Sequence, residues 1–408
     1  MQAFKAVQIP YEPTGDVLSL LEAFKTMVNH CIHAGIEKNV TSRLGLQHEV
    51  YHQLGGFGLH TWYSLSAIET ATAILKNYRK AKRKRQDIRV PRATKLMAKL
   101  GNQAYKVVDG KLRIPIKPRE YYYVPLHRRA AQFLSDAALK LGSITLAPCT
   151  VSVAFSKTAE ITEPGRYVAY DTNERSIDGA YMRGCGELAV KSHDLSRVSE
   201  ARHGYFERVR RVQAKYAKDR RVAWKIERKW FANQNKKVST VLHQTSSAIV
   251  KQAKNNKQGI ILEDLKHIRS AVNLKVLAVN NFNGRTQLVG RHSKKLRRRL
   301  NSWGFRKLQG FIEYKALWEG VKALKVNPRN TSRVCAVCGC VMQDPKAKAL
   351  GCCGVDRHVN AGLNMLRIQD EGLWFRLDRS ARVAVISPLR RAMSQSGEAI
   401  PNGNQPKR

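Results

Sequence analysis

The sequence contains no hydrophobic stretch long enough to cross a membrane. A transmembrane helix needs roughly 20 consecutive apolar residues, and polar or charged residues interrupt every apolar run of this 408-residue chain before that length. The amino-terminal residues also lack the basic, apolar and small-residue zones of a secretory signal. We therefore expect a cytoplasmic protein that does not span a membrane.

Acidic residues are scarce. Asp and Glu number 31 against 73 Lys and Arg, which gives a formal net charge of +42 at pH 7. A compact chain with this excess repels itself, so a polyanion is the expected partner. Nucleic acid is the first candidate, ahead of a membrane surface, and we expect no membrane partner.

Cysteine is scarce outside one short segment. Five of the eight cysteines lie between Cys335 and Cys353, a concentration that suits a metal site in a reducing compartment better than a disulfide framework. Cys335 and Cys338 have the spacing of a metal-binding knuckle. The adjacent pair Cys352 and Cys353 closes the cluster.

The predicted secondary structure changes twice in the first half of the chain. Residues 1–10 form one short apolar strand, and residues 17–89 carry apolar side chains at helical spacing. From residue 101 onward, short β-rich pieces follow one another, separated mostly by turns. The first strand has neighbours only if it joins these pieces. We therefore predict a small β-barrel from residues 1–15 and 101–162, with the helical region 16–100 inserted in it.

Two carboxylates stand at the ends of apolar strands beyond residue 165. The strand Tyr167–Tyr170 ends in Asp171, and the strand Ile260–Leu262 ends in Glu263. Buried carboxylates are costly without a cation, and hydrolysis of a phosphodiester uses carboxylates from different elements to hold two hard cations. Asp356 or a neighbour is the expected third contributor. The alternative is a plain hairpin with an exposed Asp171.

A helix and a strand precede the cysteines. Apolar residues recur at steps of three and four from Phe305 to Leu317, which predicts an amphipathic helix that ends at Gly320. The apolar run from Val321 to Val326 then predicts a buried strand. The cysteine knuckle is therefore set into a larger α/β domain.

Basic residues concentrate in segments that read as helices. One of these segments ends the amino-terminal helical region, and residues 199–257 form a strongly basic helical arm. A solvated surface is the alternative, but the charge of the whole chain favours a groove that holds nucleic acid. The predicted phosphate contacts are Lys80, Lys82, Arg83, Lys84, Arg85, Arg208, Arg210, Arg211, Lys215, Arg220, Arg221, Lys225, Arg228, Arg297, Arg298 and Arg299.

Four stretches beyond residue 165 resemble the successive motifs of the transposon-encoded TnpB family. They are YDTNERS, LEDLKHIR, the run from SWGFRKLQGF to SRVCAVCG, and DRHVNAGLNML, and together they span roughly residues 166–368. The family is that of the RuvC-type, RNA-guided DNA endonucleases of IS200/IS605 transposons, related to the type V CRISPR effectors. The first half is similar to the family only in the order and texture of its segments.

The resemblance implies an α/β multidomain protein with an RNase H-like (RuvC) nuclease domain over residues 163–329 and 356–370. A zinc-ribbon-like module for target nucleic acid, residues 330–355, is inserted in it, and the β-barrel becomes a wedge beside a helical recognition region. The implied partners are a guide RNA from the transposon end and a target double-stranded DNA, cut beside a short adjacent motif. We expect a prokaryotic, nucleoid-associated protein, favoured as a monomer, with Mg²⁺ or Mn²⁺ at the nuclease site and structural Zn²⁺.

The catalytic positions match the family with one exception. By position, Asp171 resembles the first catalytic Asp and Glu263 the catalytic Glu, but the place that usually holds the third Asp holds His358. His358 is one candidate for the third ligand, because neutral imidazole binds metals, and Asp356 in the preceding turn is the other. A third interpretation is an inactive site in an RNA-guided DNA-binding protein that represses or marks DNA. A strand-transfer transposase is disfavoured.

The second half of the zinc set also departs from the family. Relatives have a second Cys-x-x-Cys pair, whereas Leu350 stands here where a cysteine is expected. Adjacent ligands need a strained turn, which Gly351 and Gly354 permit. Loss of the metal is the alternative. The expected zinc ligands are Cys335, Cys338, Cys352 and Cys353, with Cys340 as a substitute.

Residues 371–408 form the last segment of the chain. Their end is polar and contains Pro, Gly, Asn and Gln, so we expect a partly disordered carboxy-terminal tail.

Overall fold

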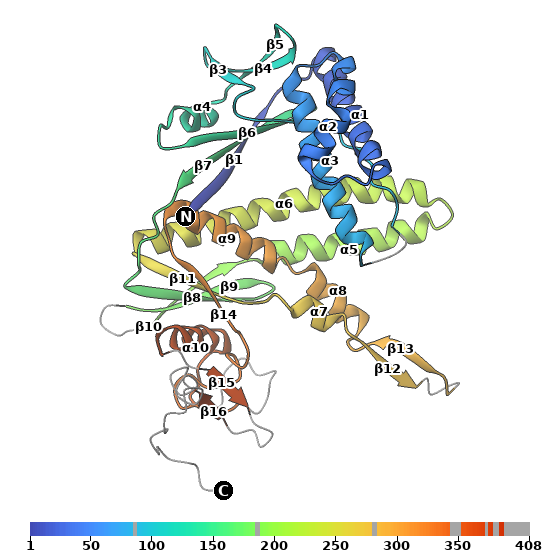
Figure 1. Cartoon of the computed structure of the whole chain (residues 1–408). Helices are drawn as coiled ribbons and strands as arrows, with labels where there is room; N and C mark the ends of the chain where they lie inside the picture. The colour runs from blue at the N-terminus through green and yellow to red at the C-terminus, as the bar shows by residue number, and fades with distance from the viewer. Residues whose placement is uncertain are drawn as a thin grey trace, which may run out of the picture. The chain divides into compact units, whose positions relative to one another are not determined.

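The computed structural model describes residues 1–84, 88–183, 188–279, 284–342, 352–371, 374–377 and 383–386. The chain forms two compact units, Met1–Thr158 and Ala159–Arg408, each with its own sheets and helices (Figure 1). Three features predicted from the sequence lie outside the described residues: Arg85, the Leu350–Gly351 step, and the end of the carboxy-terminal tail.

The first strand of the chain joins the β-rich segment that follows the helices, as predicted. Strand β1 pairs antiparallel with β7, which brings Gln2 opposite Thr158 and Pro10 opposite Thr150. Alternate residues of β7 are buried, and among these are Val151, Val153 and Phe155. The sheet has the order β1-β7-β6-β2. Its strands are β1 (Gln2–Pro10), β2 (Ala98–Leu100), β6 (Lys140–Ala147) and β7 (Thr150–Thr158).

The remaining strands of the first unit form a second sheet of order β3-β4-β5. Within the described residues the two sheets share no ladder, so the closed barrel stays a prediction. The sequence also did not predict the short helix that follows this sheet. The elements are β3 (Lys106–Val108), β4 (Lys111–Lys117), β5 (Glu120–Pro125) and α4 (Arg128–Ser135).

The predicted amino-terminal helical region consists of three α-helices and one 3₁₀ turn. The first helix buries the residues whose spacing predicted it, including Leu20, Leu21, Phe24 and Met27. The Thr14 hydroxyl begins this helix by accepting a hydrogen bond from the Val17 amide at 3.4 Å. The elements are α1 (Gly15–Glu37), α2 (Arg43–Leu54), η1 (Gly55–Phe57) and α3 (Thr61–Lys82).

A mixed five-stranded sheet of order β10-β9-β8-β11-β14 forms the centre of the second unit. Strands β8, β11 and β14 are parallel, whereas β9 and β10 run antiparallel to their neighbours. Since Tyr170 lies opposite Leu262, the carboxyl ends of β8 and β11 meet at one edge of the sheet. The strands are β8 (Arg166–Thr172), β9 (Ser176–Met182), β10 (Leu188–Asp194), β11 (Gln258–Glu263) and β14 (Ala323–Val326).

Helices cover both faces of this sheet, so the chain has the mixed α/β fold that the sequence predicted (Figure 1). Every residue of β11 is buried, as expected of a central parallel strand. On one face Ile260 and Leu262 pack with α6 and α9, and on the other Ile261 packs with α10. Gly320 ends α9 at φ 74°, which a side chain disfavours. The helices are α5 (Ser196–Lys215), α6 (Arg220–Asn255), α9 (Phe305–Glu319) and α10 (Arg357–Glu371).

An insertion between β11 and α9 was not predicted from the sequence. It contains a two-stranded antiparallel ribbon that extends away from the central sheet (Figure 1). Near the carboxyl terminus, β15 (Trp374–Leu377) pairs with β16 (Val383–Ile386). None of the described helices is both long enough and apolar enough to span a membrane. The elements of the insertion are α7 (Ile268–Val272), β12 (Lys275–Val279), β13 (Thr286–Gly290) and α8 (Lys294–Ser302).

Candidate functional site

The two predicted acids lie together at the edge of the central sheet. Asp171 and Glu263 are only 8% and 7% exposed. The backbone amide of Thr172 donates a hydrogen bond to Glu263 Oε2 at 3.1 Å, which joins the ends of β8 and β11. The Gln309 side chain of α9 donates to the Glu263 carbonyl oxygen at 3.0 Å. The fold therefore fixes both carboxylates before any ligand is bound.

Burial changes the acidity of Glu263. Desolvation raises the pKa of this carboxyl group above its ordinary value, and the nearby Asp171 charge raises it further. Without a cation, Glu263 therefore retains its proton to a higher pH than an exposed glutamate does. A divalent cation would favour the ionised form and displace this proton.

His358 reaches the same site from the first turn of α10. Its Nδ1 lies 2.6 Å from Asp171 Oδ2, across 187 positions of the sequence. The hydrogen bond with Asp171 is the main cause that raises the pKa of His358 above its ordinary value, and burial opposes it. The imidazole therefore stands beside the first acid, at the position where the resemblance led us to expect a carboxylate.

Asp356 has a different environment from His358. Its Oδ1 accepts hydrogen bonds from the His358 amide at 2.8 Å and from the Val359 amide at 3.2 Å. These are the contacts of a carboxylate that caps the amino terminus of a helix. Of the two predicted candidates for the third ligand, His358 contacts Asp171 and Asp356 caps α10.

A polar network that was not predicted from the sequence holds the first acid. Asn173 Nδ2 donates to Asp171 Oδ2 and to Asp178 Oδ2, both at 3.0 Å, and Ser176 Oγ donates to Asp178 Oδ2 at 2.6 Å. Trp303 Nε1 in turn donates to the Asn173 carbonyl oxygen at 2.9 Å. Asp178 lies directly opposite Asp171 in the β8–β9 ladder. The sequence signal for this pairing is the short turn between the two strands, because a hairpin brings residues on either side of its turn opposite each other.

The four predicted zinc ligands also come together. One sulfur atom each from Cys335, Cys338, Cys352 and Cys353 lies within 4.8 Å of the others, and Cys340 is not in this group. Gly354 has φ 65°, the left-handed conformation that a turn after adjacent ligands was expected to need.

The thiols of this cluster influence one another's acidity. The backbone amide of Cys340, followed by hydrogen bonds from Cys352 and Cys353, lowers the pKa of Cys338 to about 6. The interaction with Cys338 raises the pKa of Cys352 to about 11 and that of Cys353 to about 12. Thiols that share protons at such short range become four thiolates when a soft cation binds.

Two buried asparagines of α10 attach the cysteine knuckle to the helix that carries His358. Asn360 Nδ2 donates to the carbonyl oxygens of Thr331 and Val334 at 3.0 and 2.7 Å, and its Oδ1 accepts from the Ala336 amide at 2.7 Å. Asn364 Nδ2 donates to the same two carbonyl oxygens, both at 2.7 Å. The carboxylate site and the cysteine cluster therefore share one helix.

The predicted basic residues that the structure describes lie on the surface. Lys80, Lys82, Arg83 and Lys84 are exposed at and just after the end of α3 in the first unit. In the second unit the helices α5, α6 and α8 carry the others, all exposed except the half-buried Arg297. They are Arg208, Arg210, Arg211, Lys215, Arg220, Arg221, Lys225, Arg228, Arg297, Arg298 and Arg299.

Exposed aromatic rings, which were not predicted from the sequence, accompany these charges on α6. Trp224 and Phe231 are 57% and 54% exposed and lie two helical turns apart on one side of the helix. The Arg228 guanidinium lies 5.3 Å from the Trp224 ring centre. Basic and aromatic side chains in alternation are typical of a surface that binds single-stranded nucleic acid.

Comparisons with known proteins show what this chain is similar to. A family model described as Cas12f1-like, TNB domain, matches residues 305–365, and one described as the uncharacterized protein MJ0013 family matches residues 20–115. The TnpB-like protein MJ0751 of Methanocaldococcus jannaschii is 27% identical over 287 residues, which cover 68% of this chain and 97% of that protein. The TnpB-like protein MJ1635 of the same organism is 23% identical over 344 residues, 80% of this chain and 75% of that protein.

A solved structure has a similar fold. The matching chain of the cryo-EM structure of the Cas12f1-sgRNA-target DNA complex superposes with a TM-score of 0.54, over 86% of this chain and 83% of that chain. Its sequence is 11% identical, so the likeness concerns the fold alone.

Proposed function

Since this chain belongs to the TnpB family, we propose that it is an RNA-guided, metal-dependent DNA endonuclease. The observation that carries the proposal is the meeting of Asp171, Glu263 and His358 at one edge of the central sheet, with 2.6 Å between His358 Nδ1 and Asp171 Oδ2. The reaction is hydrolysis of a DNA phosphodiester beside a short adjacent motif. The protein is the product of an IS200/IS605-type transposon.

The strand order supports an RNase H-like (RuvC) nuclease domain. Three antiparallel strands, β8 to β10, are followed by two parallel strands on the other side of β8, with helices on both faces of the sheet. In this arrangement the two acids come from the neighbouring strands β8 and β11. The wedge-like barrel and the helical recognition region complete the domain organisation proposed for the first unit.

The donor set fits a hard divalent cation. Carboxylate oxygens are the ligands that Mg²⁺ and Mn²⁺ prefer, and among the described residues neither Asp171 nor Glu263 forms an ion pair with Lys or Arg. Asp171, Glu263 and His358 would hold the ion, with Asp356 as the alternative to His358. The bound ion would supply an activated water and stabilise charge on the leaving oxygen.

The side chains around the acids act by position and charge. Asn173 and the Thr172 amide hold the carboxylates of Asp171 and Glu263 in fixed orientations. His358 shares a proton between its Nδ1 and Asp171, which offsets part of the negative charge of the two acids. The ring has a second nitrogen, Nε2, that can bind a cation or accept a proton from a water molecule.

The cysteine cluster is proposed as a structural Zn²⁺ site. Four sulfur atoms within 4.8 Å of one another suit tetrahedral zinc coordination. The residues that would hold the ion are Cys335, Cys338, Cys352 and Cys353, which leaves no open ligand position for catalysis. The module built on this site is proposed to contact target nucleic acid.

A guide RNA and a double-stranded DNA target are the proposed partners. The net charge of +42 and the exposed basic residues of α3, α5, α6 and α8 support a polyanionic partner. Base pairing with the guide would supply sequence specificity, and the protein would read the adjacent motif and the shape of the duplex.

One observation favours a second candidate function. His358 occupies an oxygen of Asp171 that a cation would otherwise bind. If no cation displaces or joins this contact, the chain is a nuclease-inactive, RNA-guided DNA-binding protein of the same fold.

Cleavage of a randomised target plasmid library separates the two functions. The protein is copurified with RNA from its transposon end and incubated with Mg²⁺, with Mn²⁺ or with EDTA, beside an Asp171→Ala variant. The endonuclease predicts guide-dependent cuts that require a divalent cation and that Asp171→Ala abolishes. Guide-dependent binding without cuts under every metal condition would instead establish the inactive DNA-binding protein.

A further inference from the structure

A pocket between α5 and α8 lies next to the carboxylate site, and the function described above assigns no particular ligand to it. Its walls carry the basic side chains of Arg202, Lys295, Arg298 and Arg299, and Trp303 also lines it. Glu174 is its one carboxylate among the described lining residues. The pocket is therefore strongly cationic.

The single acid does not neutralise these cations. Glu174 Oε2 lies 2.8 Å from Arg299 Nε, so its charge is already paired. Within the described part of the chain, Arg202, Lys295 and Arg298 form no ion pair with a carboxylate, and the Arg298 guanidinium instead lies 5.8 Å from the Phe206 ring centre. An anion of another molecule would complete the charge balance of the pocket.

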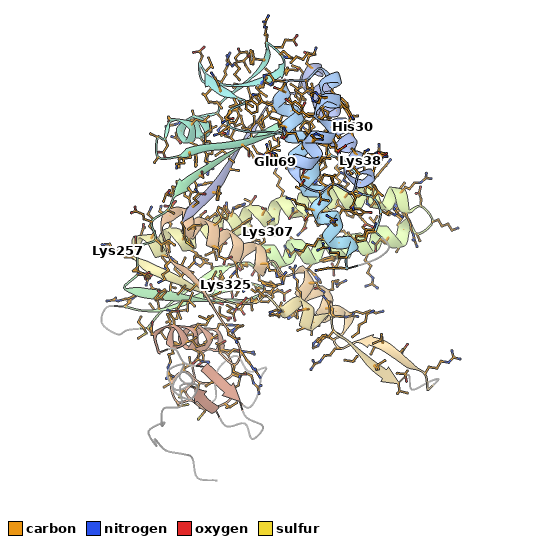
Figure 2. All side chains as sticks on the ribbon, viewed as in Figure 1. His30, Lys38, Glu69, Lys257, Lys307 and Lys325 are labelled. Atoms are coloured by element: carbon orange, nitrogen blue, oxygen red, sulfur yellow. The ribbon has the colours of Figure 1, made fainter. Side chains whose placement is uncertain are left out.

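Arg202 is the least satisfied of these side chains. It is half-buried, and its Nε atom is shielded from solvent without a hydrogen-bond acceptor among the described residues. Burial lowers the pKa of Arg202, and the charge of Arg269 lowers it further. Lys307 lies on α9 and is labelled in Figure 2. Burial lowers the pKa of Lys307, and the charge of Arg202 lowers it further. A half-buried guanidinium among like charges is costly unless an anion binds it.

The pocket is coupled to the loop that carries the first acid. Trp303 lines it and donates its Nε1 hydrogen to the Asn173 carbonyl oxygen at 2.9 Å, and Asn173 holds the Asp171 carboxylate. Glu174 is three residues after Asp171 in the sequence, so their Cα atoms are at most about 11 Å apart. This separation is only a few steps of a nucleic-acid backbone, whose charges recur about every 3.4 Å of axis on each strand.

We propose that this pocket binds a backbone phosphate of the DNA strand that enters the Asp171–Glu263 site, and that Arg202 is the positioning residue that holds it. The proposal rests on the proposed function, because it assigns the phosphate to the strand at that site. A guanidinium suits this ligand, since it donates two parallel hydrogen bonds to phosphate oxygens. A phosphate held a few nucleotides from the cut would fix the register of the strand against the acids.

The test replaces single phosphates of the target strand by uncharged methylphosphonates, one position at a time. Binding of guide-loaded protein is measured in an Asp171→Ala background without divalent cation, so no DNA is cut. We expect one or two linkages near the cut position where the neutral group weakens binding about tenfold. In Arg202→Gln these linkages lose their effect. The slope of the logarithm of the binding constant against the logarithm of the salt concentration becomes shallower by about one.

Two further variants control for folding and for charge. Arg202→Lys keeps the charge and should restore part of the sensitivity at the same linkages. Arg210→Gln removes a charge from the exposed side of the same helix, so it should weaken binding at all linkages alike and leave the position dependence in place. Thermal unfolding of each variant shows whether it is folded.

Several results would overturn the proposal. Arg202→Gln with an unchanged linkage profile would remove Arg202 from the phosphate contact. The same would follow if methylphosphonates in the guide RNA, and not in the target strand, lost their effect in Arg202→Gln. Normal cleavage by the native chain without any sensitive linkage would reject the pocket alone, whereas failure to bind guided DNA at all would reject the proposed function as well.

Discussion

The carboxylate site and the cysteine cluster share α10 but are held in place by different means. Asp171 and Glu263 are buried at the ends of adjacent parallel strands, so the sheet positions them without an ion. Cys338, Cys352 and Cys353 are exposed on short turns, and only Cys335 of the four is buried. We infer that the first site is pre-organised for a cation that comes and goes, whereas the second depends on its metal for its shape.

The largest expected effect separates chemistry from fold at the carboxylate site. Asp171→Ala should reduce guided DNA cleavage by about 10³-fold or more, because the proposed cation would lose one ligand. The zinc content and the thermal unfolding midpoint should change little, since the sheet does not depend on this ion. Cleavage assays and metal analysis of the same preparation provide the measurement.

Asp264→Ala is the matched control for this change. Asp264 follows Glu263 directly, but its carboxylate lies 3.1 Å from Lys266 Nζ and outside the site. We expect its cleavage rate to stay within a few-fold of the native rate. Equal losses in Asp171→Ala and Asp264→Ala would contradict the assignment of Asp171.

The next effect concerns the residue that links the carboxylate site to α10. His358→Ala should lower the cleavage rate by about 100-fold, because a group in contact with Asp171 is removed. His358→Asp introduces the carboxylate expected from the resemblance and should favour Mg²⁺, which prefers oxygen, over transition-metal ions that accept nitrogen. Rates are measured over a series of Mg²⁺ and Mn²⁺ concentrations.

Two results would change this interpretation. A folded His358→Asp variant that is as inactive as His358→Ala would show that the imidazole has a role that a carboxylate cannot perform. Cleavage by His358→Asp where the native chain only binds DNA would instead show that the native chain is the inactive DNA-binding protein.

The cysteine cluster should respond in the opposite way, with a loss of structure. Cys338→Ser removes a ligand from the four-sulfur group, so we expect loss of bound zinc and a thermal unfolding midpoint lower by several degrees. Cys340→Ser is the matched control, because Cys340 lies outside this group and should leave the zinc content at one ion per chain. Zinc loss in Cys340→Ser with retention in Cys338→Ser would reverse the assignment.

A smaller effect tests the attachment between the two sites. Asn360→Ala leaves the Ala336 amide without its acceptor and should lower the free energy of unfolding by about 3 kcal/mol, measured by urea titration. Asn364→Ala should cost about 1 kcal/mol, because Asn360 still donates to the two carbonyl oxygens that both residues contact. Equal losses of unfolding free energy in the two variants would show that the hydrogen bond from the Ala336 amide to Asn360 Oδ1 adds no measurable stability.

The same comparison explains what the sequence could predict. The clustering of the four cysteines was predictable because they lie in one short segment where spacing alone is informative. Asp171 and Glu263 were predictable because each ends an apolar strand, and parallel neighbours bring such ends together. The strand pairing of β1 and the helix α9 were predictable for similar local reasons, since each has a clear apolar pattern.

Features that depend on contacts between distant segments were not predictable. The choice between Asp356 and His358 depends on where α10 begins, because a cap and a residue in the first turn face different neighbours. The bond from Trp303 to Asn173 joins positions 130 residues apart, and no local pattern indicates it. The α7–α8 insertion has short, exposed elements whose apolar pattern is too weak to predict them.

The last prediction is a pH dependence that belongs to the carboxylate site alone. The pKa of Glu263 is raised in the folded, metal-free protein. Its contribution to stability is therefore complete below the pKa of an unfolded glutamate, about 4.3, and is lost as pH rises through the raised value. Metal-free native protein should thus lose more stability between pH 5 and 8 than Glu263→Gln does, as measured by urea titration with EDTA. Added Mg²⁺ should reverse the trend, because the cation binds ionised Glu263 and its stabilising effect grows with pH. Parallel pH profiles for the two proteins would mean that Glu263 ionises freely and that the site is less enclosed than its burial indicates.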